Sequence, residues 1–199
     1  SRREDRRNVA IVAHVDHGKT TLVNQMLAQT GVFGEHGDYS DRVMDSGDLE
    51  KEKGITILAK NTAIRRAGAG KDGSDLIINV IDTPGHADFS EDTYRVLSAV
   101  DAAVMLIDGA KGLEPQTLKL FRVCKARGLP IVTVVNKWDR PGREPLSLVD
   151  EIVSEIGLVP TPLYWPVGEA GDFRGLAHVN EGQVDQYVHF VRTAGGATI

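Results

Sequence analysis

Residues 9–20 read Val9-Ala10-Ile11-Val12-Ala13-His14-Val15-Asp16-His17-Gly18-Lys19-Thr20. The first five residues are apolar without interruption, which favours a strand that is covered on both faces. The polar turn leads into residues 19–29, where apolar side chains recur on one helical face. A strand, a glycine-bearing turn and a helix in this order are typical of a loop that holds phosphate groups.

The residues of this turn have the chemistry that a phosphate ligand needs. Gly18 permits a tight backbone turn, so successive N–H groups point inward, and the helix N-terminus adds its positive dipole. Lys19 supplies a positive charge for the β- and γ-phosphates, and the Thr20 hydroxyl can bind Mg²⁺. Ala13 stands where the pattern usually begins with glycine. The alternative is an ordinary strand-to-helix turn with a solvated lysine.

Three further apolar runs predict the rest of a sheet, at Leu76–Ile81, Ala102–Ile107 and Ile131–Val135. The polar residues that end the four runs are His14, Asp82, Asp108 and Asn136. Helical patterns lie between the runs, at Lys19–Gln29, Ser90–Val100 and Glu114–Arg127. Alternating strands and helices predict an α/β fold with a mostly parallel, doubly wound sheet and helices on both faces, and the phosphate-binding turn at 13–20 makes the P-loop NTPase class the expected one. Ligands bind beyond the carboxyl ends of such strands, so we expect the four polar ends to meet at one edge.

The second motif, Asp82-Thr83-Pro84-Gly85-His86, follows the predicted strand at 76–81. Asp82 can hold a metal ion through water, and the Gly85 N–H can approach a γ-phosphate. His86 can orient an attacking water. The alternative for His86 is a hydrogen-bonded surface histidine.

The third motif, Asn136-Lys137-Trp138-Asp139, follows the predicted strand at 131–135. The Asp139 carboxylate can accept two hydrogen bonds from the N1 and N2 edge of guanine, a pair that adenine does not offer. Asn136 can bridge the base and the phosphate loop, and the stem of Lys137 can lie over the purine ring. Taken alone, this four-residue pattern is also typical of an ordinary turn.

The fourth motif, Gly54-Ile55-Thr56, closes a long polar segment at 31–54. Thr56 can add a second hydroxyl to Mg²⁺ when a γ-phosphate is present, which would tie the order of this segment to the nucleotide state. The alternative is that Thr56 simply starts a strand at 56–66. The spacing Gly68-x-Gly70-x-x-Gly73 resembles a dinucleotide fingerprint, but no helix follows it, so a hairpin loop is predicted there.

Composition limits the classes of function. The chain has 199 residues, 41% of them hydrophobic, and a formal net charge of −5, which argues against a nucleic-acid groove and sequence-specific DNA binding. Its one cysteine, Cys124, excludes a disulfide framework and a cysteine-based zinc site. No apolar run approaches the ~18 residues of a membrane helix or forms a signal-peptide core. We therefore expect a cytoplasmic protein with no membrane partner.

Together and in this order, the four motifs resemble the GTP-binding domain of translational GTPases, over about residues 8–140. Up to about Phe89 the sequence is similar to the BipA/TypA ribosome-associated GTPase, including the stretch Lys53-Gly54-Ile55-Thr56-Ile57-Leu58-Ala59-Lys60-Asn61. From Phe89 onward, including Tyr164-Trp165-Pro166-Val167-Gly168, it is similar to bacterial peptide chain release factor three. A divergent relative, a chimera and a designed sequence are all compatible with this change.

The resemblance implies that His86 is catalytic and positions the hydrolytic water once ribosomal RNA engages it. It implies an apolar gate of Val15 and Ile55 in front of His86, and help from Asp16 in neutralising charge near the phosphates. The candidate nucleotide-binding residues are Val15, Asp16, His17, Gly18, Lys19, Thr20, Thr21, Asp82, Gly85, Asn136, Lys137 and Asp139. The candidate metal ligands are Thr20, Thr56 and Asp82.

We expect a GTP-binding domain over residues 1–166 and, over residues 167–199, the start of a β-rich inserted subdomain that the chain truncates. The resemblance also implies a Ser-Ala element that closes over guanine and downstream β-barrel domains, and neither is in this chain.

The expected function is binding and Mg²⁺-dependent hydrolysis of GTP to GDP in a ribosome-associated translation factor, similar to release factor three or to BipA/TypA. Turnover is expected to be slow without the ribosome, because no arginine in the motifs is placed to act as a finger. Two alternatives remain. One is a module that binds GTP and GDP without significant turnover, and the other is an ATP-using P-loop protein, which Asp139 disfavours.

Overall fold

A computed structural model of the chain describes residues 3–30, 60–83, 91–169, 171–180, 183–189, 191–193 and 196–198. The chain forms two compact units. The first comprises Ser1–Ile107 and Lys119–Val134, and the second comprises Asp108–Leu118 and Val135–Ile199. Among the described helices, none combines the length and the apolar character that crossing a bilayer requires.

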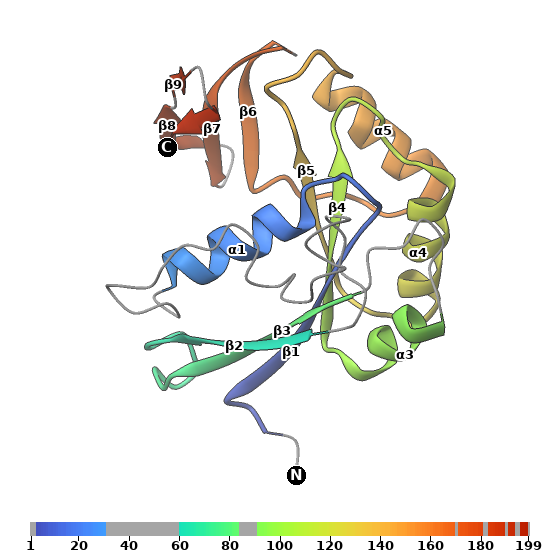
Figure 1. The fold of residues 1–199 in the computed structure, drawn as a ribbon, viewed down its shortest axis with the longest axis vertical. Coiled ribbons are helices and arrows are strands. Elements are labelled where there is room, and N and C mark those ends of the chain that lie inside the picture. Colours follow the sequence, from blue (N-terminus) through green and yellow to red (C-terminus); the bar gives the residue numbers. More distant parts are fainter. Residues whose placement is uncertain are drawn as a thin grey trace, which may run out of the picture. The chain divides into compact units, whose positions relative to one another are not determined.

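A five-stranded sheet in the order β2-β3-β1-β4-β5 organises the fold (Figure 1). Its strands are β1 (Arg6–Ala13), β2 (Lys60–Arg66), β3 (Leu76–Asp82), β4 (Ala102–Asp108) and β5 (Ile131–Asn136). Both β3 and β4 pair with β1 in parallel, whereas β2 pairs with β3 in antiparallel. A mixed but mostly parallel sheet confirms the predicted α/β class.

The centre of β1 shows why its run of apolar residues forms a strand. Residues 10–13 of β1 are at most 3% exposed, because a central parallel strand is covered on both faces. A cluster of buried side chains joins this strand to its neighbours and to helix α1 (Lys19–Gln29), namely Ile11, Val23, Leu27, Ile64 and Val80. The apolar face predicted for residues 19–29 therefore faces the sheet.

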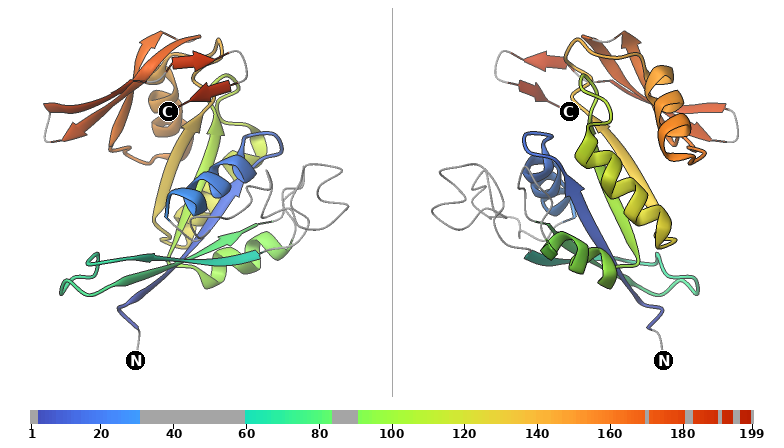
Figure 2. Two further views of the ribbon diagram at one scale, coloured as in Figure 1. Left: turned by 60° about the vertical axis from the view of Figure 1, so that its left-hand side comes forward. Right: turned by 90° about the vertical axis from the view of Figure 1, so that its right-hand side faces the viewer.

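Three more helices follow, α3 (Glu91–Ala99), α4 (Pro115–Ala126) and α5 (Pro145–Ile156). Within the first unit, α1 lies on one side of the strands and α3 on the other (Figure 2). The part of α4 in that unit buries Leu120, Phe121 and Cys124 completely. Cys124 is thus a packed core thiol, and its burial raises its pKa.

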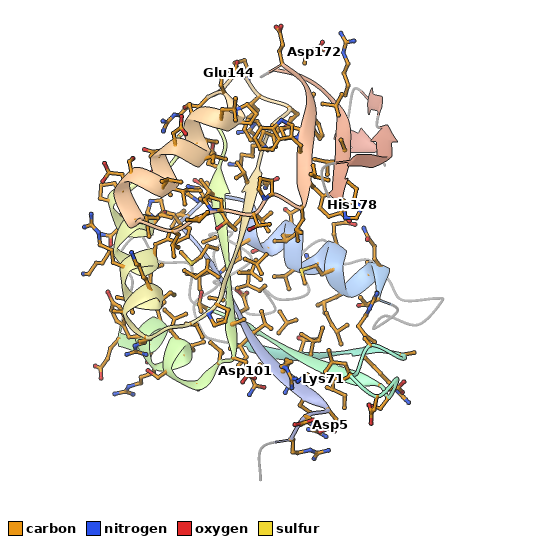
Figure 3. All side chains as sticks on the ribbon, turned by 180° about the vertical axis from the view of Figure 1, so that it is seen from behind. Asp5, Lys71, Asp101, Glu144, Asp172 and His178 are labelled. Atoms are coloured by element: carbon orange, nitrogen blue, oxygen red, sulfur yellow. The ribbon has the colours of Figure 1, made fainter. Side chains whose placement is uncertain are left out.

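The second unit contains an antiparallel sheet in the order β6-β7-β8, formed by β6 (Tyr164–Glu169), β7 (Asp172–Asn180) and β8 (Gln183–His189). Asp172 and His178, labelled in Figure 3, lie towards opposite ends of β7. Two short strands, β9 (Val191–Thr193) and β10 (Gly196–Thr198), pair with each other in antiparallel. The boundary between 166 and 167 stays a prediction, and β6 runs across it.

The predicted strands and helices are confirmed within a residue or a few at their ends. Three strands end one residue later than predicted, so Asp82, Asp108 and Asn136 are the last residues of β3, β4 and β5. The segment with Gly68, Gly70 and Gly73 is a turn between antiparallel strands, as predicted. For the strand predicted at 56–66, the structure describes β2 from Lys60, and residues 56–59 lie outside the described residues.

Candidate functional site

The turn after β1 has the backbone of a phosphate loop. Gly18 precedes α1 with φ 92°, a left-handed conformation that glycine adopts without strain. Asp16 is also left-handed, with φ 64°, which aspartate tolerates better than most residues. The His17 N–H donates to the His14 carbonyl at 3.3 Å, and the Leu22 N–H donates to the Gly18 carbonyl at 2.9 Å. The loop thus closes tightly and passes directly into the helix.

Lys19 and Asp82 form a buried ion pair. The Lys19 Nζ lies 3.0 Å from Asp82 Oδ1, and the side chains are 6% and 0% exposed. The same Nζ donates a hydrogen bond to the Thr83 carbonyl oxygen. The parallel pairing of β1 with β3 brings the two motifs together. Each charge compensates the other, which is the condition for keeping either one in the interior.

Thr83 fixes the end of β3 against β1, a contact that the sequence analysis did not assign. Its hydroxyl donates to the Ile11 carbonyl oxygen at 2.8 Å, and the residue is completely buried. This bond holds in place the carbonyl oxygen that accepts from Lys19. Only its position directly after a strand signals such a role in the sequence.

The rings of the two loop histidines, His14 and His17, make contacts within the protein. The His17 ring is completely buried, and its Nδ1 lies 3.3 Å from the Leu106 carbonyl oxygen of β4. The His14 and His17 rings meet edge to face, 5.5 Å apart. Within the described part of the chain, no group of three or more His, Cys, Asp or Glu residues is arranged to hold a metal. The His17 imidazole therefore anchors the loop to the neighbouring strand.

The other candidates of the first unit fall into two groups. Val15 and Thr20 are half-buried in or next to the loop, whereas Asp16 and Thr21 are exposed. Thr56, Gly85 and His86 lie outside the described residues. Their assignments stay predictions.

In the second unit, Asn136 ends β5, and Lys137 and Asp139 lie in the turn that follows it. Lys137 is left-handed, with φ 66°, and the Arg140 N–H donates to its carbonyl oxygen at 3.1 Å. The Lys137 Nζ lies 3.3 Å from Asp108 Oδ2. Asp139 is half-buried. The turn therefore has a fixed backbone with the Lys137 ammonium group held to one side.

Asp108, the last residue of β4, supports this turn, and the sequence analysis treated it only as a polar strand end. Its Oδ1 accepts the backbone N–H groups of Ala110 at 2.8 Å and Lys111 at 3.3 Å. Burial by itself raises the pKa of this carboxyl, but these hydrogen bonds and Lys137 outweigh burial and leave the pKa below its ordinary value. Asp108 is therefore a stable anion beside Lys137 at neutral pH.

The oxygen donors of the first unit fit a magnesium ion. Mg²⁺ prefers hard oxygen ligands and keeps several waters, so one or two protein groups together with phosphate oxygens suffice. Thr20 supplies a hydroxyl at the start of α1, and Asp82 supplies a fully buried carboxylate at the end of β3. The positive charge of Lys19 balances Asp82 in this structure, so a metal ion bound here would also need the negative charge of phosphate oxygens.

Comparison with known proteins shows the family to which the chain belongs. The family model described as "Elongation factor Tu GTP binding domain" matches residues 4–197. The match covers both compact units and all four motifs.

Curated relatives with high identity are named "Peptide chain release factor 3". The protein from Cyanothece sp. (strain PCC 7425 / ATCC 29141) is 48% identical over 199 residues, covering 97% of this chain and 35% of its own. The protein from Microcystis aeruginosa is 52% identical over 179 residues, covering 87% of this chain and 32% of its own. The chain thus spans about a third of the length of these relatives.

A solved structure shows the same fold. A crystal structure of a protein from Thermus thermophilus superposes with a TM-score of 0.73 at 27% identity, covering 96% of this chain and 27% of that one. The fold described above is therefore shared with a much longer protein.

Proposed function

This chain belongs to the elongation factor Tu GTP-binding domain family, and from that premise we propose that it binds GTP with Mg²⁺ and hydrolyses it to GDP as part of a translation factor of the release factor 3 kind. The observation that carries the proposal is the buried ion pair between Lys19, at the start of α1, and Asp82, at the end of β3. A lysine and a carboxylate in the interior are costly unless they serve one another or a ligand.

The phosphates of GTP would bind at the loop of 13–20. The left-handed Gly18 and the N-terminus of α1 present backbone N–H groups and a positive dipole. Lys19 would exchange its contact with Asp82 for one with the β- and γ-phosphates. Thr20 and Asp82 would hold the Mg²⁺, together with Thr56. The metal ion supplies charge neutralisation for the β- and γ-phosphate oxygens.

The guanine would bind at the turn of 136–139. Asp139 would accept hydrogen bonds from N1 and N2 of the base, and Asn136 would also contact the base. Lys137 would lie over the purine ring through its stem while its Nζ stays near Asp108. Adenine would leave the Asp139 carboxylate without these two hydrogen bonds, so ATP would bind more weakly than GTP.

Hydrolysis would depend on water positioning by His86 in contact with the ribosome, with Gly85 donating to the γ-phosphate. Before the ribosome binds, Val15 and Ile55 would form an apolar gate that keeps His86 away from the attacking water. Catalysis of this kind consists of positioning and charge stabilisation, so turnover without the ribosome is slow.

Among translation factors, release factor 3 is the better-supported assignment. The relatives of that name are similar over most of the chain, including its first half. The likeness of residues up to Phe89 to BipA/TypA stays a prediction. The ribosome is the proposed partner and the cytoplasm the proposed location.

Calorimetric titration of the 199-residue chain with GTP, GDP and ATP in Mg²⁺ tests the binding proposal. We expect both guanine nucleotides to bind and ATP to bind at least about a hundredfold more weakly, because its base leaves Asp139 unpaired. Preference for ATP, or no nucleotide binding, would reject the proposal.

Ribosome-stimulated release of phosphate from GTP by the wild type and by His86→Ala tests the catalytic assignment. Equal rates would remove His86 from the mechanism. Binding of guanine nucleotides without any ribosome-stimulated GTP hydrolysis would favour a nucleotide-dependent binding module.

A further inference from the structure

The base-binding turn is supported by a second turn, residues 108–113, which follows β4 in the same compact unit. The Gly109 N–H donates to the Asn136 carbonyl oxygen at 2.9 Å. Asp108 Oδ2 lies 3.3 Å from the Lys137 Nζ. Two of the three proposed guanine-recognition residues are therefore held by the turn at 108–113.

Two residues hold the supporting turn in place: Arg143, just before α5, and Glu151, within α5. We propose that Arg143 and Glu151 are positioning residues for guanine recognition, which act by clamping the turn at 108–113. This inference rests on the proposed function, because it concerns how the guanine-binding turn is kept in place.

Glu151 connects α5 to the supporting turn. Its Oε2 accepts from Arg143 Nη1 at 2.5 Å and lies 3.4 Å from the Leu113 backbone nitrogen, which donates to it. Arg143 Nη2 also donates to the Ser147 hydroxyl at 3.3 Å. The pair is half-buried, at 36% and 23% exposed for Arg143 and Glu151, so solvent screens it less than a fully exposed pair.

Gly112 leaves the space that the clamp occupies. It is left-handed, with φ +71°, and a Cβ atom there would overlap Arg143 Nη1 and lie 2.9 Å from Glu151 Oε2. The turn therefore needs glycine for its backbone conformation and for the close approach of the ion pair.

The backbone of Arg143 completes the link to the base-binding turn. Its N–H donates to the Gly109 carbonyl oxygen at 3.3 Å, and Gly109 in turn donates to Asn136. Gly142 packs closely here, because a Cβ on it would lie 3.0 Å from Ala110 Cα. A continuous set of contacts thus leads from α5 through residue 109 to residue 136.

The base-binding turn needs such support for a physical reason. The left-handed backbone of Lys137 is unfavourable for an L-residue, and such a conformation persists only where the surroundings enforce it. Two parallel hydrogen bonds from one carboxylate to the guanine edge tolerate little displacement. Loosening the turn at 108–113 would therefore weaken guanine selectivity before it weakens phosphate binding.

The test compares GTP with inosine triphosphate, which lacks only the 2-amino group. The ratio of their Kd values measures the hydrogen bond from N2 to Asp139, and an unfolded fraction of protein changes both values equally. We expect a ratio of roughly tenfold or more in the wild type. In Glu151→Gln we expect the ratio to fall by about threefold or more, because the charged clamp is lost.

Two further variants make the test specific. Gly112→Ala keeps every charge but displaces Arg143, and we expect the ratio to fall in the same way. Glu155→Gln makes the same chemical change at an exposed site on α5 and should keep the wild-type ratio.

An unchanged ratio in both Glu151→Gln and Gly112→Ala would overturn the inference while leaving GTP binding intact. A wild type that does not discriminate between the two nucleotides would instead reject the guanine site of the proposed function. If Glu151→Gln does not fold, Gly112→Ala and Arg143→Lys test the inference instead. Arg143→Lys keeps the charge but loses the planar guanidinium group, so the ratio of the two Kd values should again fall.

Discussion

At the scale of single residues, the two proposed binding turns use the same device. A lysine meets a carboxylate that ends a neighbouring strand, with Lys19 on Asp82 and Lys137 on Asp108. The Lys137 ammonium group is thereby held in place before any ligand arrives, which lowers the entropic cost of binding, whereas Lys19 would change partners when phosphate binds. Asp82 is completely buried, so its charge depends strongly on Lys19.

Lys19→Met should therefore destabilise the nucleotide-free protein as well as abolish tight GTP binding. Removing one partner of a buried ion pair leaves an uncompensated charge, and we expect the free energy of unfolding to fall by about 3 kcal/mol. Urea denaturation followed by circular dichroism measures this change.

Adding Asp82→Asn to Lys19→Met should recover part of the stability but none of the GTP binding. Lys119→Met, at an exposed site on α4, should leave the free energy of unfolding unchanged. Wild-type stability in the single variant Lys19→Met would show that the buried pair contributes nothing.

At the scale of elements, α5 carries the clamp residue Glu151 and was not among the elements predicted from the sequence. Its signals are present: Pro145 stands in its first turn, and Leu148, Ile152 and Ile156 recur at four-residue spacing and are all buried. The helix ends at Gly157, which is left-handed with φ 67° and donates its N–H to the Val153 carbonyl oxygen at 2.9 Å.

Gly157→Ala should lower the free energy of unfolding by about 1 kcal/mol, because an L-residue resists the left-handed conformation that this helix end requires. Gly157→Asn should cost less, since asparagine tolerates that conformation. Ser154→Ala, at an exposed site on the same helix, provides the control. Equal stability of the alanine and asparagine variants in denaturant titrations would contradict this explanation.

At the scale of the whole molecule, the residues that we propose for the phosphates and for the guanine are divided between the two compact units. Lys19 and Asp82 belong to the first unit, and Asn136, Lys137 and Asp139 belong to the second. A bound nucleotide stabilises the residues that it contacts, by an amount that depends on its concentration relative to Kd.

Hydrogen exchange should reveal which of these residues a nucleotide contacts. With saturating GDP and Mg²⁺, we expect slower amide exchange in peptides covering 14–20 and in peptides covering 136–139. Inorganic tripolyphosphate, which has no base, should slow exchange only in the first set. Protection of 136–139 by tripolyphosphate would contradict the assignment of that turn to the guanine.

The fold class was accessible from the sequence because its signals are local. Apolar runs marked the strands, and the strand, turn and helix of residues 9–29 fixed the type of fold. The missed features are contacts between distant segments. Nothing in the local pattern says that the Thr83 hydroxyl meets the Ile11 carbonyl oxygen, or that Glu151 reaches the turn after β4.

The sequence by itself determined the class of fold, the tight turn at Gly18 before α1 and the residue types that can serve phosphate, magnesium and guanine. These follow from backbone sterics and from side-chain chemistry, which act over a few neighbouring residues. Only the tertiary structure decided that the ring of His17 turns to β4, that Asp108 holds Lys137 and that Arg143 and Glu151 enclose Gly112. Strand pairing and core packing bring these groups together, and both depend on contacts between residues far apart in the chain.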